Sequence, residues 1–83
     1  MKVYVFWESI AGPQYSSHSD GDLWYGNVAQ LINGAGHGRV YVYETEAKLW
    51  YRYSKGIRGR LNEEAMPEDE VPKVFKLLLT LES

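Results

Sequence analysis

The chain has 83 residues, which is enough for a single compact domain spanning residues 1–83 and too few for two. It contains no cysteine, which excludes disulfides and cysteine-based zinc sites and leads us to expect a reducing, cytoplasmic setting. The net charge of −2 argues against a general nucleic-acid binder. No apolar run approaches the roughly 20 residues of a membrane-spanning helix, so no membrane contact is expected.

The first part of the chain predicts a strand, a loop and a helix. Residues 2–8 (KVYVFWE) alternate between two largely apolar faces, which is typical of a strand inside a sheet. Residues 9–26 are rich in Gly, Ser and Asp and predict a long loop. Residues 27–36 predict a short helix, capped by Asn27 or, if it begins earlier, by Asp22.

Two aromatic strands are predicted next, and they should pair as a hairpin. Residues 39–45 and 48–54 are rich in β-branched and aromatic side chains. Glu-Ala is not a favoured two-residue turn, so the connection should also include Thr45 and Lys48. The alternating pattern predicts a core-facing set that consists of Val40, Val42, Leu49, Tyr51 and Tyr53.

The C-terminal part predicts a basic loop that runs into an acidic segment, followed by a closing helix over residues 69–82. Asp69 and Glu70 suit the positive end of this helix, and Pro72 fits its first turn. Its apolar stripe consists of Val71, Val74, Phe75, Leu78 and Leu81. The order β-α-β-β-α predicts an α+β fold, in which a small three-stranded sheet carries two helices packed on one face.

The uncovered face of such a sheet would carry an aromatic and basic surface, which is the main candidate site. Single-stranded nucleic acid binds sheets of this kind through ring stacking and Lys or Arg contacts to phosphate. Protein interfaces are enriched in the same residue types, and cross-strand packing alone would also explain them. The candidate binding residues are Arg39, Tyr41, Tyr43, Lys48, Trp50, Arg52, Lys55, Arg58 and Arg60.

Two charged segments of opposite sign lie close together in the sequence. Residues 48–60 carry five positive charges and residues 63–70 carry five negative charges. We expect them either to face each other or to lie on separate solvated surfaces. The polar segment with His18, Asp20 and Asp22 is interpreted as a turn and a helix cap, so no metal site and no cofactor are predicted.

The sequence predicts a non-enzymatic protein-binding domain, because it has no cysteine nucleophile and no evident catalytic triad. In size and composition it is similar to small inhibitors, encoded by viruses or mobile elements, that occupy a surface of a host protein. The alternative is a single-stranded nucleic-acid or nucleotide-binding module that uses the same sheet face. Loop 9–26 and the acidic run 63–70 are further candidate contacts, and an exposed apolar face also allows a homodimer.

Overall fold

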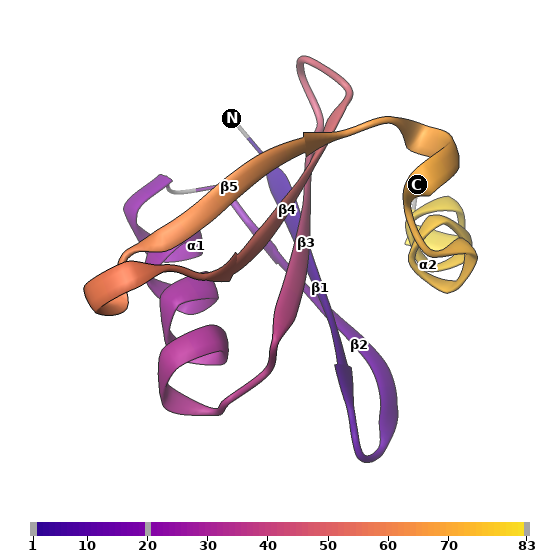
Figure 1. The fold of residues 1–83 in the computed structure, drawn as a ribbon. Coiled ribbons are helices and arrows are strands. Elements are labelled where there is room, and N and C mark those ends of the chain that lie inside the picture. Colours follow the sequence, from indigo (N-terminus) through magenta and orange to yellow (C-terminus); the bar gives the residue numbers. More distant parts are fainter. Residues whose placement is uncertain (1, 20, 83) are drawn as a thin grey trace.

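A computed structural model of the protein describes residues 2–19 and 21–82, without the side chains of residues 21 and 22. The described residues form an antiparallel sheet of five strands in the order β2-β1-β3-β4-β5, with a helix on either side of it (Figure 1). The strands are β1 (Val3–Ser9), β2 (Gly12–His18), β3 (Arg39–Glu44), β4 (Leu49–Lys55) and β5 (Leu61–Met66).

The helical segments differ in length and type. The two α-helices are α1 (Gly21–Ala29) and α2 (Lys73–Glu82). A π-helical turn, η1 (Gln30–Gly34), continues α1, while η2 (Ile57–Gly59) and η3 (Glu68–Glu70) are short 3₁₀ turns. Neither α-helix among the described residues has the length and apolar character needed to cross a membrane.

The α+β class is confirmed, but the prediction of three strands is wrong because both edge strands were missed. Strand β2 lies inside the predicted loop 9–26, where the chain turns after Ser9 and Gly12 adopts a φ of 110°. Pro13 and the small polar residues of β2 weaken its strand signal, yet such residues are tolerated at a sheet edge. Strand β5 contains exposed Glu63 and Glu64, and charged edge strands resist pairing with other chains.

Several predicted elements are confirmed with small shifts. The N-terminal strand is β1, and it lies inside the sheet between β2 and β3. Residues 45–48 join β3 to β4 as expected, and Lys48 adopts a φ of 57°. The first helix begins at Gly21, so Asn27 lies in its interior rather than at its cap. The other proposed cap, Asp22, has no described side chain.

The closing helix begins later than predicted. The 3₁₀ turn η3 comes first, and α2 starts after Pro72, whose carbonyl accepts a hydrogen bond from the backbone N–H of Phe75 at 3.1 Å. Leu81 is exposed and does not belong to the packed stripe. Tyr15 of β2 donates a hydrogen bond from its hydroxyl to the carboxylate of Glu82, which ties the end of α2 to that edge of the sheet.

The two helices lie on opposite faces of the sheet, which corrects the prediction that both pack on one face (Figure 1). The core on the α1 side consists of Val3, Val5, Val28, Ile32, Val40, Val42 and Tyr53. The core on the α2 side consists of Tyr4, Phe6, Tyr41, Trp50, Val71 and Phe75. The reason lies in β1, whose consecutive residues from Val3 to Phe6 are all buried, so that both of its faces need a covering layer.

Candidate binding site

The aromatic sheet face that the sequence predicted to be open is covered by α2. Tyr41 is only 8% exposed and Trp50 only 3% exposed. The ring of Tyr41 packs 5.5 Å from that of Phe75 of α2, and the ring of Trp50 packs 5.3 Å from that of Phe6. The premise of an exposed stacking platform is therefore wrong for these two rings, because both are buried in the core on the α2 side and leave no open face on which a base could stack.

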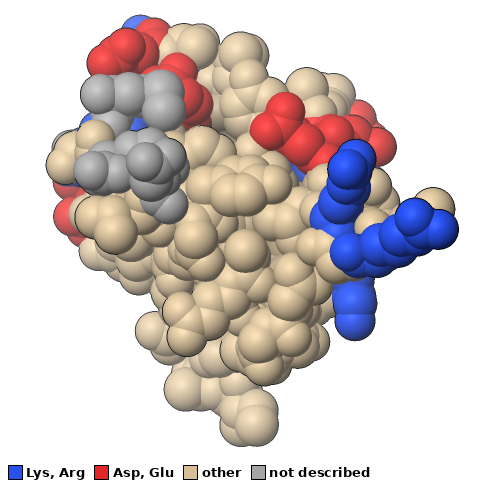
Figure 2. All heavy atoms as spheres, turned by 90° about the vertical axis from the view of Figure 1, so that its left-hand side faces the viewer, with Lys and Arg blue, Asp and Glu red and all other residues tan. Residues whose placement is uncertain are grey.

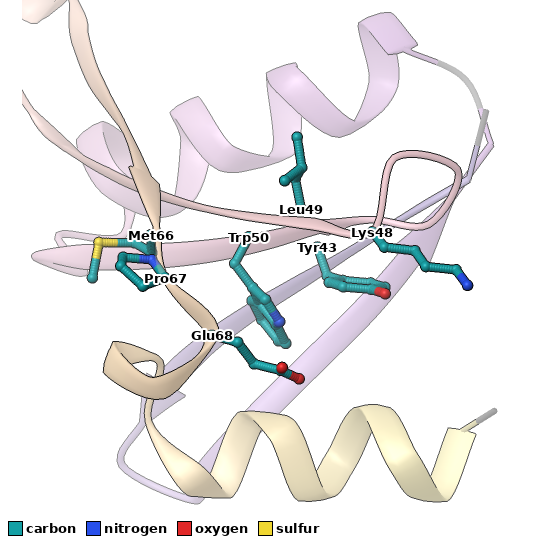
Figure 3. Close-up of a pocket in the computed structure, with 7 residues that line it drawn as sticks. All are labelled: Tyr43, Lys48, Leu49, Trp50, Met66, Pro67 and Glu68. Atoms are coloured by element: carbon teal, nitrogen blue, oxygen red, sulfur yellow. The ribbon is translucent and has the colours of Figure 1, made fainter.

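Three of the predicted residues, Tyr43, Lys48 and Trp50, instead line a cavity of about 350 Å³ at one end of the β3–β4 hairpin. The complete lining is Tyr43, Lys48, Leu49, Trp50, Met66, Pro67 and Glu68. Figure 3 shows the rings of Tyr43 and Trp50 next to each other in this cavity, with their centroids 5.0 Å apart, and the Lys48 side chain extending outward past Tyr43. Leu49, predicted in the core, points away from them and is exposed.

The surroundings of this cavity disfavour ionisation of Tyr43. Burial raises the pKa of the Tyr43 hydroxyl, and the negative charges of Glu68 and Glu44 raise it further. A tyrosine hydroxyl is protonated at neutral pH even without this shift, so Tyr43 can donate a hydrogen bond there. With one cation and one carboxylate at its rim, the cavity can hold a small polar group against an aromatic wall, but it presents no arrangement of base and nucleophile.

The remaining predicted residues are Lys and Arg side chains. Arg39 and Arg52 lie on strands β3 and β4, and the others lie around the turn that joins β4 to β5. Arg52 of β4 forms an ion pair with Glu64 of β5, with Nη2 and Oε1 2.5 Å apart. At this pair the two oppositely charged segments do face each other, as one of the two interpretations expected. An exposed pair of this kind contributes at most about 1 kcal/mol. Arg39 is exposed at the start of β3, where it pairs in register with Ser54.

The other three predicted cations, Lys55, Arg58 and Arg60, are exposed around the turn that joins β4 to β5. None of them forms an ion pair with another residue that the structure describes. The turn is closed by two backbone hydrogen bonds, from Gly56 N–H to the Arg60 carbonyl at 2.7 Å and from Arg60 N–H to the Ile57 carbonyl at 3.1 Å. The turn therefore displays its cations on a defined backbone.

Two exposed apolar residues on this side of the sheet were not predicted as site residues. Ile57 is 83% exposed at the tip of the turn, and Tyr25 of α1 is exposed on the same side of the sheet, with its ring 6.3 Å from that of Tyr53. Asn33 connects the two parts by donating a 3.4 Å hydrogen bond to the carbonyl of Gly59. The α1–turn surface is defined by Tyr25, Lys55, Ile57, Arg58 and Arg60. Figure 2 looks onto this side, where Lys and Arg side chains protrude at the edge of a largely uncharged area.

A signal for Tyr25 was present in the sequence. Leu23, Trp24 and Tyr25 are three consecutive large apolar residues, and a helix that carries such a run cannot turn all of them toward one core. The run falls inside the predicted loop 9–26, and only the alternative start of the helix at Asp22 would make it helical. Ile57 lies alone between glycine and arginine, and no periodicity predicts its exposure.

His18 belongs to a polar cluster that connects β2 to α1. Its Nε2 lies 2.9 Å from Ser16 Oγ and 3.2 Å from Asn27 Nδ2, and that amide also donates to Ser16 Oγ at 3.0 Å. The predicted turn and helix cap at Asp20 and Asp22 stay a prediction, because Asp20 and the Asp22 side chain lie outside the described residues. Among the residues that are described, no group of three or more His, Cys, Asp or Glu could hold a metal ion.

Tyr53 should make the fold less stable as the pH rises above 10. It is 2% exposed, and its hydroxyl donates to the carboxylate of Glu63. Burial raises its pKa above the ordinary value of 10.0, and the hydrogen bond to Glu63 raises it further. Above pH 10 the unfolded chain therefore releases this proton while the folded chain keeps it, so stability falls by about 1.4 kcal/mol per pH unit from this group.

Tyr53→Phe should accordingly flatten the decrease in the free energy of unfolding between pH 10 and pH 11, measured by urea denaturation. Tyr25→Phe, on the same side of the sheet, is the matched control. If the free energy of unfolding fell as steeply with pH in Tyr53→Phe as in the natural sequence, the Tyr53 hydroxyl would not be a buried group with a raised pKa.

Comparison of the chain with protein-family models, with curated proteins and with solved structures gives no match in any of the three. The function is therefore inferred from the surfaces and cavities described above.

Proposed function

We propose that the protein is a non-enzymatic domain that binds another protein through the α1–turn surface. The observation that carries the proposal is the exposure of Ile57 at the tip of a hydrogen-bonded turn, with Tyr25 on the same side of the sheet and three cations on the turn that form no ion pair with a described residue. An apolar anchor surrounded by charged groups is the usual composition of a protein interface. The positive charge favours a partner whose contact surface is acidic and partly apolar.

The defined shape of the turn supports this function. Its two backbone hydrogen bonds and the link from Asn33 to Gly59 hold the displayed side chains in place before a partner arrives. A surface that is already ordered loses less conformational entropy on binding than a flexible loop does. The β4–β5 turn therefore suits recognition better than a mobile segment of the same composition.

The nucleic-acid alternative receives less support. Stacking of successive bases needs several exposed rings, whereas Tyr41 and Trp50 lie beneath α2 and the α1–turn surface offers one ring, that of Tyr25. The cations of the turn remain available for phosphate, but three cations and one ring give weak, salt-sensitive binding with little base recognition. We therefore favour a protein partner over single-stranded nucleic acid or a nucleotide.

A domain that binds in this way would act by occupying a surface of its partner, as do small inhibitors from viruses and mobile elements. We place that activity in the cytoplasm, on the argument that so small a domain without cysteine suits a reducing compartment.

The test is capture from cell extract by the immobilised domain, with and without nuclease. The double variant Ile57→Ser/Arg60→Glu should bind the captured protein about 10- to 100-fold more weakly than the natural sequence does. The matched control, Leu77→Ser/Lys73→Glu, makes the same two kinds of change on exposed positions of α2 and should retain binding. Circular dichroism checks that both variants are folded.

Two results would contradict the proposal. Loss of the partner in the α2 control, with full retention in the turn variant, would place the contact on the opposite side of the sheet. If only nucleic acid were recovered, and nuclease abolished its capture, nucleic acid would replace protein as the favoured class of partner. A salt titration would then show a steep loss of affinity, roughly one log unit per log unit of salt for each phosphate neutralised.

A further inference from the structure

A second cavity lies on the α1 side of the sheet and has a different character from the one beside Tyr43. Its volume is about 220 Å³. The lining consists of Val3, Trp24, Val42, Glu44, Tyr51, Tyr53 and Glu63. Among these described residues are three aromatic rings and two carboxylates, and there is no Lys or Arg. Such a cavity repels anions and offers several ring faces to a cation.

The rings and carboxylates are held in place by their neighbours. The rings of Trp24 and Tyr53 pack edge to face at the wall of the cavity, with their centroids 6.0 Å apart and an angle of 69° between the ring planes. The carboxylate of Glu63 accepts the hydrogen bond from the Tyr53 hydroxyl. The carboxylate of Glu44 accepts hydrogen bonds from the backbone N–H groups of Glu46 at 2.9 Å and Ala47 at 2.5 Å.

The two carboxylates of the cavity have no counter-charge among the Lys and Arg side chains that the structure describes. The hydrogen bonds to Glu44 and Glu63 come from uncharged donors, and neither carboxylate forms an ion pair with a described Lys or Arg. In addition, Trp24 Nε1 is buried and has no hydrogen-bond acceptor among the described residues. A buried donor of this kind favours a ligand that brings an oxygen atom.

We propose that this cavity binds a small organic ammonium cation whose nitrogen carries methyl groups and which has an oxygen atom nearby. Methylated ammonium groups are attracted to the faces of Trp and Tyr, and their methyl groups can be buried against apolar side chains such as Val3 and Val42. The carboxylates of Glu44 and Glu63 supply the compensating charge. A hydrated metal ion fits less well, because rings and valines offer it no oxygen ligands.

The lining of this cavity shares no residue with the α1–turn surface, but the two sites adjoin, because the ring of Tyr25 lies 5.9 Å from that of Trp24 and 6.3 Å from that of Tyr53. Choline is the probe, since it combines a trimethylammonium group with a hydroxyl oxygen. Its neutral analogue, with a tert-butyl group in place of trimethylammonium, has nearly the same shape and lacks the charge. Sodium chloride keeps the ionic strength constant in every titration.

The full chain, labelled with ¹⁵N, is titrated with each compound while the indole N–H resonances of its tryptophans are followed by NMR. Choline should shift the Trp24 resonance saturably, and the neutral analogue should bind at least about 10-fold more weakly. Glu63→Gln should weaken choline binding several-fold, whereas Glu68→Gln, in the cavity beside Tyr43, should leave it unchanged.

Three outcomes would overturn this inference. Equal affinity for choline and the neutral analogue would show that the cavity recognises only apolar shape. A shift confined to Trp50 would assign the binding to the other cavity. The absence of any saturable shift in the natural sequence would show that this cavity is not a cation site, and this result does not depend on the folding of a variant.

Discussion

Replacing Phe75 with alanine is expected to lower the free energy of unfolding by about 3–5 kcal/mol. Phe75 is 2% exposed, and its ring packs 5.6 Å from that of Phe6 and 5.5 Å from that of Tyr41. The substitution removes the side chain that fixes α2 to the sheet and leaves a cavity among rings. A domain of this size has a total stability on the order of 5 kcal/mol, so urea denaturation should show a variant close to unfolding.

Leu77→Ala is the matched control for this experiment. Leu77 lies on the same helix and is 63% exposed, so its truncation should change stability by no more than about 0.5 kcal/mol. Similar losses for the two variants would mean that α2 does not pack on the sheet through Phe75. The aromatic face would then be accessible, and the binding site predicted there from the sequence would become tenable again.

Gly56→Ala is expected to destabilise the fold by about 2–4 kcal/mol. A Cβ atom at residue 56 would lie 2.4 Å from the Arg60 carbonyl oxygen and 2.9 Å from Asn62 Oδ1. The first of these neighbours is backbone, and it is also the acceptor of the 2.7 Å hydrogen bond from the Gly56 N–H. The turn can relieve the overlap only by opening this bond, so the presentation of Ile57 should change as well.

The control is Gly38→Ala, because a Cβ atom at residue 38 would meet nothing within 4 Å. Its effect on stability should stay within about 0.5 kcal/mol in either direction. Urea denaturation gives both values, and partner capture by Gly56→Ala reports on the turn itself. If the two glycine variants were equally stable, the turn would not have the closed geometry on which the protein-binding proposal depends.

The strands and helix that carry a strong local pattern could be predicted from the sequence. The alternation in residues 39–45 and 48–54 correctly assigned Val40 and Val42 to one face and Tyr41 and Tyr43 to the other. The apolar stripe of residues 69–82 correctly indicated a helix with Phe75 in its packed face. In these segments the local preference of the residues agrees with the tertiary structure.

The edge strands and the placement of the helices could not be predicted in the same way. The sequence of β2, GPQYSSH, has little intrinsic strand preference and is extended because it pairs with β1 along its whole length. The side of the sheet that α2 covers depends on the path of the chain through β5, which no local pattern reveals. The best available sign was β1, since apolar residues on both of its faces require two covering layers.

The candidate sites likewise combine residues that a local sequence pattern indicates with residues that only the fold brings together. The cations of the β4–β5 turn form a local cluster, and the sequence alone could point to them. Tyr25 lay in a segment interpreted as a loop, and Trp24, Glu44 and Glu63 are brought to one cavity only by the fold. A site assembled from distant segments needs the tertiary structure before it can be recognised.

The central structural claim is that α2 covers the ring-bearing face of the sheet. A nuclear Overhauser experiment on the folded protein tests it most directly. Contacts between the ring protons of Phe75 and those of Phe6 and Tyr41 are predicted, because the ring centroids lie 5.6 and 5.5 Å apart. If Phe75 showed contacts only to residues of its own helix, the aromatic face would be uncovered and the claim would be contradicted.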